Sequence, residues 1–404
     1  MEPSKARAIV EKALVQGNGI LRLKPAWVAR DFLPPGYRLG LKEEEYDVGE
    51  RGYICERWLA SVTKADNRIG PPDEGLSYLA LDSGEQLTLK EAVEVAGAEI
   101  MGTEYARTHK GLGRLAKIYD FAARIPYHIH QRKEDVAPLG RNPKEEAYYF
   151  PEGLDMGPHP ETFFGVHPHI VEQKKMDLLL PHLVEWKDDL ILRYSRAYLL
   201  VPGEGFHLPS GVLHAPGTAV TIELQEDSDV FAMLQAKVAG KIISKDLLFK
   251  DVPPDKRAQL GERAVLEQID WETSGDPYFY ENRHTAPILI QETQQEGGEE
   301  YWIYYNTTKF SGKKLVVKPG KSFISVDKGV YNILVWQGEG RYDGHPIKAR
   351  DFDQDELLIT YAKATTPIKV ENTGREDLVI IKFFGPDINL DVPMIPRYPP
   401  GSAA

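Results

Sequence analysis

Three histidines have a spacing that suits a metal site. His128 and His130 flank one isoleucine in an apolar run, and His214 ends the stretch GEGFHLPSGVLH, shortly after a Pro-Ser-Gly turn. Side chains alternate along a β-strand, so both imidazoles of an H-x-H motif point to one face and converge. The turn fixes the backbone ahead of His214 and directs its ring inward from a second strand. Two imidazoles from one strand and a third from another make half of a metal site.

Glu146 is the fourth predicted ligand. It opens the apolar and aromatic run AYYF, whose composition predicts a strand. Three neutral imidazoles and one carboxylate suit Zn²⁺, Mn²⁺, Fe²⁺, Co²⁺ or Ni²⁺, and the ligand set does not choose among them. Zinc is the ion that we expect first, as a single divalent cofactor.

The distribution of histidines places this site in one part of the chain. Nine of the eleven histidines lie between His109 and His214, so a histidine-built site belongs to that segment. The alternative for the H-x-H pair is that both rings face solvent or make ordinary hydrogen bonds, with no metal between them.

Composition and charge exclude several classes of function. With 42% hydrophobic and 27% charged residues the chain has the composition of a soluble globular protein, and no run reaches the length of a membrane span. The net charge of −12 argues against binding to nucleic acid. The single cysteine, Cys55, rules out an intrachain disulfide framework. We therefore expect a cytoplasmic protein with no membrane or nucleic-acid partner; the sequence leaves the oligomeric state open.

The pattern of elements predicts a mainly β protein with additional helices. Residues 88–100 have a threonine N-cap and apolar positions at helical spacing, and residues 169–192 have a helical pattern that Pro181 interrupts. Residues 195–236 and 284–390 are series of short strands separated by Gly, Pro, Asp and Asn turns. Regular short strands of this kind are typical of antiparallel barrels or sandwiches, so two β-rich blocks predict a duplicated barrel.

These blocks divide the chain into four predicted parts. Residues 1–112 form a mixed helical and stranded segment that packs on the first barrel, and residues 113–240 form the metal-binding barrel. Residues 241–283 form a helical connector. Residues 284–395 form a second barrel, which lacks both an H-x-H and a P-x-G-x-x-H motif and is therefore predicted to be metal-free.

The spacing of the four predicted ligands resembles the two sequence motifs of the cupin barrel. Glu146 is followed by six residues and Gly153, and Gly203 by five residues and the segment PSGVLH. These match H-x-H…E-x6-G and G-x5-P-x-G-x2-H. The resemblance implies a bicupin of two antiparallel barrels or jelly rolls. The chain departs from the motifs in its long loop before Glu146 and in Thr218, where asparagine is common.

The long loop and several sequence blocks resemble one branch of cupins, the type I mannose-6-phosphate isomerases. The similarity covers roughly residues 50–240, with a weaker echo in the second barrel. The blocks that carry it are CERWLAS, GRLAKIYDFAARIPYHIHQ, PKEEAYYF, LPSGVLHAPG and TIELQEDSDVFAML. The family's ligands Gln, His, Glu and His fall on the four predicted ligands, with His128 in place of glutamine.

The resemblance also implies residues for the reaction. Two active-site lysines of the family fall on Lys117 and Lys144, and a cleft glutamate falls on Glu223. The family's arginine falls on Met233, which can neither hold a phosphate nor donate hydrogen bonds. We add His207 as an acid/base candidate, because alternation could place it in the cavity. Each of these residues could instead be an ordinary surface or packing residue.

The function that we expect is a metal-dependent aldose–ketose isomerase. Such an enzyme moves a proton between C1 and C2 of a sugar or sugar phosphate through an enediol, with the metal as electrophile. Two alternatives stay open: an iron-dependent cupin oxygenase, and a non-catalytic carbohydrate-binding cupin. The expected partner is a small carbohydrate.

Overall fold

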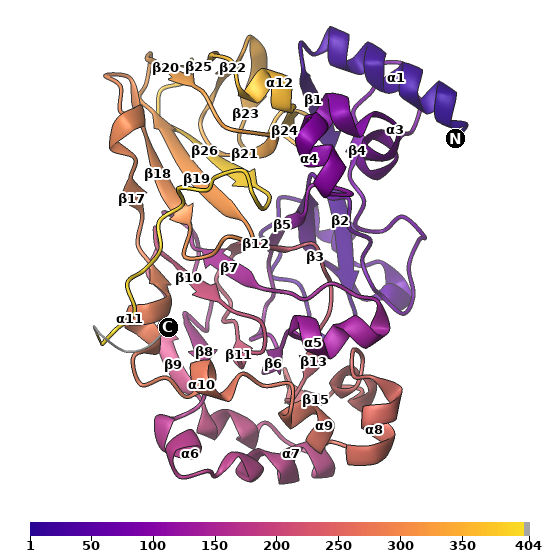
Figure 1. Ribbon diagram of the computed structural model, residues 1–404, viewed down its shortest axis with the longest axis vertical. Helices are drawn as coiled ribbons and strands as arrows, with labels where there is room; N and C mark the ends of the chain where they lie inside the picture. The colour runs from indigo at the N-terminus through magenta and orange to yellow at the C-terminus, as the bar shows by residue number, and fades with distance from the viewer. Residues whose placement is uncertain (400–404) are drawn as a thin grey trace.

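Antiparallel β-sheets form the framework of the computed structural model, which describes residues 1–399. Four large sheets follow one another along the long axis of the molecule, and Figure 1 shows them from the yellow-orange end at the top to the magenta helices at the bottom. We call them by their strand numbers: the four-, eight-, seven- and five-stranded sheets. All strand pairs within residues 1–399 are antiparallel.

The seven- and five-stranded sheets face each other and hold the predicted ligands. In order across the seven-stranded sheet, the strands are β16 (His284–Thr285), β10 (Gly205–Leu208), β7 (Glu146–Tyr149), β12 (Thr221–Glu226), β5 (Arg114–Tyr119), β3 (Tyr53–Leu59) and β2 (Ala26–Arg30). The five-stranded sheet comprises β13 (Ala232–Met233), β6 (His128–Ile129), β11 (His214–Ala215), β8 (Glu161–Phe164) and β9 (Arg196–Leu199).

The eight- and four-stranded sheets form the other half of the molecule. The eight-stranded sheet comprises β17 (Ile288–Leu289), β18 (Gly298–Tyr304), β19 (Ser311–Val317), β26 (Leu378–Phe384), β21 (Tyr331–Gln337), β24 (Glu356–Ile359), β1 (Ile20–Lys24) and β4 (Tyr78–Leu79). The four-stranded sheet comprises β20 (Ser322–Ser325), β25 (Ile368–Asn372), β22 (Glu339–Tyr342) and β23 (His345–Lys348). A small hairpin joins β14 (Lys237–Val238) to β15 (Lys241–Ile242).

Alternation along the strands of the seven-stranded sheet separates an apolar face from a polar one. Ile222 and Leu224 of β12 and Ala147 of β7 belong to the core that packs against the eight-stranded sheet. Glu223 and Glu146 occupy the intervening positions and therefore point the other way, toward the five-stranded sheet. The apolar face fixes the register of these strands, and the register places the polar side chains in the gap between the two sheets.

Helices cover the ends and edges of the sheets. They are α1 (Pro3–Gln16), α2 (Glu43–Tyr46), α3 (Leu89–Met101), α4 (Thr103–Thr108), α5 (Lys133–Val136), α6 (Pro168–Glu172), α7 (Leu180–Glu185), α8 (Pro254–Leu260), α9 (Arg263–Leu266), α10 (Trp271–Ser274), α11 (Phe279–Arg283) and α12 (Tyr361–Ala364). In Figure 1, α6 to α9 lie at the end beyond the five-stranded sheet. No helix of residues 1–399 is long and apolar enough to cross a membrane.

The predicted helix over residues 88–100 is confirmed. Thr88 caps α3 by accepting a hydrogen bond from the Glu91 backbone N–H, and the Glu91 side chain accepts one from the Thr88 backbone in return. The segment 169–192 differs from the prediction. It forms several short helices, and Pro181 lies in the first turn of α7, where its missing N–H costs no helical hydrogen bond.

The prediction of two barrels is confirmed as a mainly β architecture of antiparallel sheets, but none of the sheets within residues 1–399 closes on itself. Each half is a pair of open sheets packed face to face. The N-terminal residues contribute to both halves, because β2 and β3 join the seven-stranded sheet whereas β1 pairs with β24 of the eight-stranded sheet. The division into four parts stays a prediction.

Candidate metal centre

The three predicted histidine ligands lie together in the gap between the seven- and five-stranded sheets. His214 of β11 is directly opposite His128 of β6 across the strand pair, and their ring centroids are 4.0 Å apart. The ring of His130 lies 4.9 Å from that of His128 and 5.1 Å from that of His214. All three side chains are buried, and one ring nitrogen of each lies within 4.8 Å of the others. Such a group could hold a metal ion.

Hydrogen bonds to the backbone fix the tautomer of every one of these rings. Nδ1 lies 2.6 Å from the Pro126 carbonyl oxygen in His128, 2.7 Å from that of Val230 in His130, and 2.8 Å from that of Val212 in His214. A carbonyl oxygen can only accept, so Nδ1 carries the proton in each ring. Each neutral ring then presents an unprotonated Nε2, and orientation of this kind is usual for metal-binding histidines.

Glu146 reaches the histidines from the facing sheet. Its Oε2 lies 3.0 Å from Nε2 of His130, and its Oε1 lies 3.0 Å from Nε2 of His214. The Tyr148 hydroxyl donates to Oε1 and Lys144 Nζ lies 3.0 Å from Oε2, whereas both Nε2 atoms are buried without a hydrogen-bond partner. Acceptor atoms that face one another at this distance need a cation between them. The donor set therefore fits a divalent metal ion.

The surroundings keep His128 and His130 neutral and the Glu146 carboxylate charged. Burial, together with the other two histidines, holds the pKa of His128 well below its usual value. Burial and the charge of Lys144 lower the pKa of His130 to about 3. Burial raises the pKa of Glu146, but Lys144 and the neighbouring histidines outweigh it and hold this pKa well below its usual value. Neutral imidazole and ionised carboxylate are the forms that bind a metal.

Glu223 and the two predicted lysines lie next to this cluster. Lys144 Nζ lies 3.0 Å from Oε2 of Glu146 and 3.2 Å from Oε1 of Glu223. Lys117 Nζ lies 3.4 Å from the same oxygen of Glu223, because β5 places it directly opposite Glu223 of β12. All these side chains are buried. The structure thus brings three of the predicted acid/base groups, Lys117, Lys144 and Glu223, into one site with the predicted ligands.

The two kinds of side chain have opposite pKa shifts. Burial and the negative charge of Glu146 raise the pKa of Glu223 to about 7, although Lys117 and Lys144 lower it. Burial lowers the pKa of Lys144, but Glu146 and Glu223 outweigh it and raise this pKa above its usual value. Lys144 is therefore a permanent cation and hydrogen-bond donor, and Glu223 is the group that can exchange a proton near neutral pH.

A buried ion network beside the site was not predicted from the sequence. Arg30 Nε donates to Oε1 of Glu56 at 2.7 Å, and its Nη2 lies 3.1 Å from Oδ1 of Asp229. Glu56 also lies 3.6 Å from Lys117 Nζ. Glu56 and Asp229 occur in the blocks CERWLAS and TIELQEDSDVFAML, so the sequence marked both segments without assigning these residues a role. Through Glu56, this network helps to position Lys117.

The cavity in front of the histidines is small and has an apolar wall. Its volume is about 50 Å³. The charged lining residues are three cations and four carboxylates: Arg30, Lys117, Lys144, Glu56, Glu146, Glu223 and Asp229. The apolar lining residues include Phe32, Phe121, Ile125, Phe231 and Met233. Met233 pairs with His128 across β13 and β6, so the position of the family's arginine directly adjoins a predicted ligand.

His207 lies outside this cavity, which corrects the prediction that it reaches the site. In the register of β10 against β7, Leu208 is opposite Glu146 and His207 is opposite Ala147. His207 therefore points to the far side of the sheet. There its Nε2 lies 2.9 Å from Oε1 of Glu145, and its Nδ1 accepts a hydrogen bond from Asn306 at 3.2 Å.

Comparison with known proteins supports the fold. No protein-family model matches the chain, and no curated protein sequence matches it. Solved structures do match. A candidate mannosephosphate isomerase from Archaeoglobus fulgidus is similar at 14% identity, covering 91% of this chain and 97% of that one, with a TM-score of 0.60.

Two further structures are similar over nearly their whole length. The mannose 6-phosphate isomerase from Bacillus subtilis matches at 16% identity over 90% of this chain and 99% of that one, with a TM-score of 0.59. A point mutant of the phosphomannose isomerase from Salmonella typhimurium matches at 12% identity over 91% and 100%, with a TM-score of 0.60. The resemblance to type I mannose-6-phosphate isomerases is confirmed at the level of the fold.

Proposed function

We propose that this protein is a metal-dependent aldose–ketose isomerase that acts on a small carbohydrate. The observation that carries the proposal is the position of Glu223, Lys117 and Lys144 beside Glu146 in one cavity. Lys144 Nζ lies 3.0 Å from Glu146 and 3.2 Å from Glu223, and Lys117 Nζ lies 3.4 Å from Glu223. A metal centre alone would serve many functions. A carboxyl group able to move a proton, held beside two lysine donors, is what aldose–ketose isomerisation requires in addition.

The metal would be held by the four residues predicted from the sequence. They are His128, His130, Glu146 and His214, and their inward-facing atoms are unprotonated acceptors. Zinc is the ion that we propose first, since three imidazoles and a carboxylate suit it. When bound, the metal supplies an electrophile that stabilises negative charge on the substrate's oxygens.

Glu223 is the residue that we propose to move the proton. Its carboxylate takes the C2 proton of the aldose, which leaves an enediolate. A proton is then delivered to C1 while the proton of the C2 hydroxyl passes to O1, which gives the ketose. Lys117 and Lys144 flank Oε1 of Glu223 and can donate hydrogen bonds to the substrate's oxygens as charge develops there.

The lining favours an unphosphorylated sugar over a sugar phosphate. All three cationic side chains at the cavity already have carboxylate partners: Arg30 with Glu56 and Asp229, and the two lysines with Glu223. Met233 supplies no positive charge. The lining therefore has no excess cation to neutralise the two negative charges of a phosphate group. A volume of about 50 Å³ admits only the reacting end of a sugar.

Proton exchange in D₂O tests this proposal. The metal-loaded protein is incubated with mannose, fructose and their 6-phosphates, and deuterium at C1 or C2 is followed by NMR. We expect exchange on an unphosphorylated sugar, and much less on the matching 6-phosphate. Absence of exchange on all four sugars, with stoichiometric metal bound, would refute the isomerase.

An iron-dependent oxygenase is the second candidate, and one observation favours it. The apolar side chains of Phe32, Phe121 and Phe231 line the cavity, and they suit a less polar substrate than a sugar. Oxygen consumption by the iron-loaded protein, with no sugar exchange, would support this candidate. Sugar binding without either reaction would instead indicate a carbohydrate-binding cupin.

A further inference from the structure

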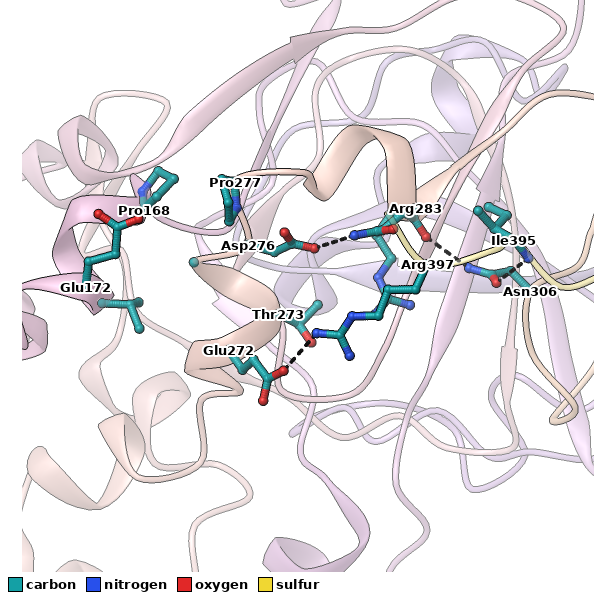
Figure 2. Close-up of a pocket in the computed structure, with 13 residues that line it drawn as sticks. Pro168, Glu172, Glu272, Thr273, Asp276, Pro277, Arg283, Asn306, Ile395 and Arg397 are labelled. Atoms are coloured by element: carbon teal, nitrogen blue, oxygen red, sulfur yellow. Dashed lines mark hydrogen bonds and ion pairs between the residues drawn. The ribbon is translucent and has the colours of Figure 1, made fainter. Parts of the chain in front are cut away.

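A second cavity lies apart from the histidine cluster, between α6, α10, α11 and the chain near Arg397. Its volume is about 360 Å³, within the range of pockets that bind small molecules. Figure 2 shows its lining, which includes α10 and α11, the segment around Asn306, and the chain near Arg397. No residue of the predicted metal centre lines it.

Arg283 lies in this cavity with few partners of its own. It is the last residue of α11, and its guanidinium is half-buried. Nη1 makes one long hydrogen bond of 3.4 Å to Nδ1 of His207, while Nε is fully buried and has no hydrogen-bond partner. Within residues 1–399 no carboxylate forms an ion pair with it. A half-buried guanidinium with so few acceptors is stabilised when an anion binds to it.

Glu145 is the carboxylate that His207 contacts, and it already has hydrogen-bond partners other than Arg283. Oε1 of Glu145 accepts hydrogen bonds from Thr307 and from Nε2 of His207, which leaves Nδ1 of that ring as an acceptor. Asn306 donates to the same Nδ1 at 3.2 Å. His207 thus offers Arg283 one shared lone pair rather than a negative charge.

A second guanidinium adds to the positive charge of the cavity. Arg397 lines the same cavity, where it pairs with Glu272 at 2.9 Å (Figure 2). Burial lowers the pKa of Arg283; Glu145, Asp270 and Asp276 oppose this effect, and the charge of Arg397 adds to it. An anion bound between Arg283 and Arg397 would offset the cost of burying the Arg283 guanidinium and the repulsion between the two positive charges.

We propose that this cavity binds a small carboxylate-bearing molecule through Arg283, with Arg397 as a second cationic contact. The planar guanidinium matches a carboxylate through two parallel hydrogen bonds. Glu172, Glu272 and Asp276 also line the cavity. Their negative charge disfavours a phosphate monoester, which carries nearly two charges at neutral pH, and suits hydroxyl or amino groups on the rest of the ligand. The site is independent of the proposed isomerase activity.

Calorimetric titration of the full chain with propionate tests the site, with inorganic phosphate as the competing probe at constant ionic strength. We expect saturable binding of one propionate per chain and weaker binding of phosphate. Arg283→Gln should weaken propionate binding at least tenfold, and Arg397→Gln should weaken it by a smaller factor. Arg375→Gln, which removes the same charge from an exposed turn, should leave it unchanged.

A further variant separates this cavity from the metal centre. His214→Ala should bind propionate as the wild type does, because the site does not use that ring. Absence of saturable propionate binding, tighter binding of phosphate, or an equal loss of affinity in the Arg283 and Arg375 variants would each overturn the proposal. So would a loss in His214→Ala, which would place the propionate at the metal centre. Thermal unfolding of Arg283→Gln checks that the variant is folded.

Discussion

Each half of the molecule buries a cluster of polar and charged side chains between its two sheets, but the two clusters differ in how these side chains are paired. In one half, the metal cluster lies between the seven- and five-stranded sheets; its residues are His128, His130, Glu146 and His214. In the other half, a paired cluster lies between the eight- and four-stranded sheets; its residues are Glu300, Lys313, Asp327 and Lys382. Lys382 Nζ contacts Glu300 at 2.5 Å, Ser325 at 2.6 Å and Asp327 at 2.8 Å. Lys313 contacts Asp327 at 2.6 Å.

The difference between the clusters distinguishes a candidate binding site from a structural network. The paired cluster has two cations and two carboxylates, and their charges cancel within the protein. The metal cluster instead presents buried nitrogen and oxygen acceptors to one another, an arrangement that could hold a metal ion. Buried polar atoms that lack partners therefore indicate function more strongly than buried charge by itself.

Removing one ligand should have the largest effect in the metal half. We expect His214→Ala to lower the affinity for the metal by more than about 100-fold and to abolish proton exchange on the sugar. Residues that only orient a metal ligand typically change the affinity by roughly 10- to 100-fold. Metal analysis after dialysis measures the stoichiometry. His159→Ala, at an exposed histidine outside the cluster, is the matched control and should keep its metal. Stoichiometric metal in His214→Ala would refute the ligand assignment.

Removing the proton-transfer group should separate catalysis from metal binding. Glu223→Gln keeps the shape of the side chain but cannot take a proton, so exchange in D₂O should fall by about 10²- to 10⁴-fold. Bound metal should stay stoichiometric, because Glu223 is not among the ligands. Glu226→Gln, at the last residue of the same strand, is the control. Full exchange activity in Glu223→Gln would exclude it as the acid/base group.

Breaking the paired cluster should affect stability and leave the metal centre intact. Lys382→Met leaves buried carboxylates with too few cations, so the free energy of unfolding should fall by about 3–5 kcal/mol. Urea unfolding measures this loss. Lys348→Met, which breaks an exposed pair with Glu339, should cost at most about 1 kcal/mol. Loss of metal from folded Lys382→Met would mean that the two halves are not separate in function.

Acid should lower the stability of the protein by protonating Glu56, a buried and paired carboxylate beside the metal cluster. Burial raises the pKa of Glu56, but Arg30 and Lys117 outweigh it and lower this pKa to about 2. A depressed carboxyl pKa gives stability that is present above the unfolded pKa of about 4.3 and is lost as the pH falls toward 2. We expect a loss of about 1–3 kcal/mol over this window, measured by urea unfolding at each pH.

The matched variants test whether this loss belongs to Glu56. Glu56→Gln should be less stable than the wild type near neutral pH and should flatten the pH dependence below pH 4.5. Glu44→Gln, at an exposed position, should keep the wild-type profile. An unchanged profile in Glu56→Gln would show that other carboxyl groups cause the acid sensitivity.

The residues of the metal cluster were predictable because the sequence signals that mark them are local. The alternation of His128 and His130 and the turn before His214 act within a few residues, and the spacing around Glu146 reinforced them. His207 was misplaced because its side depends on the register of β10 against β7, in which Leu208 rather than His207 faces Glu146's side of the sheet. A one-residue change of register reverses every side chain of a strand.

Long-range pairing limited the prediction elsewhere. Arg30 meets Glu56 and Asp229 across 26 and 199 residues of sequence, and no local pattern marks such a contact. Similarly, the pairing of β1 with β24 joins the N-terminal residues to the C-terminal half, although the sequence suggested that they pack on the first barrel. The mainly β class and α3 were predictable because strand alternation, turns and caps are local signals.

Anomalous X-ray diffraction from crystals of the metal-loaded chain tests the central claim most directly. Data collected on both sides of the metal's absorption edge locate the ion without reference to activity. We expect one strong peak about 2.0–2.2 Å from Nε2 of His128, His130 and His214 and from a carboxylate oxygen of Glu146, and none at Lys382. A saturated crystal with no peak at this position, or with its metal bound elsewhere, would contradict the account.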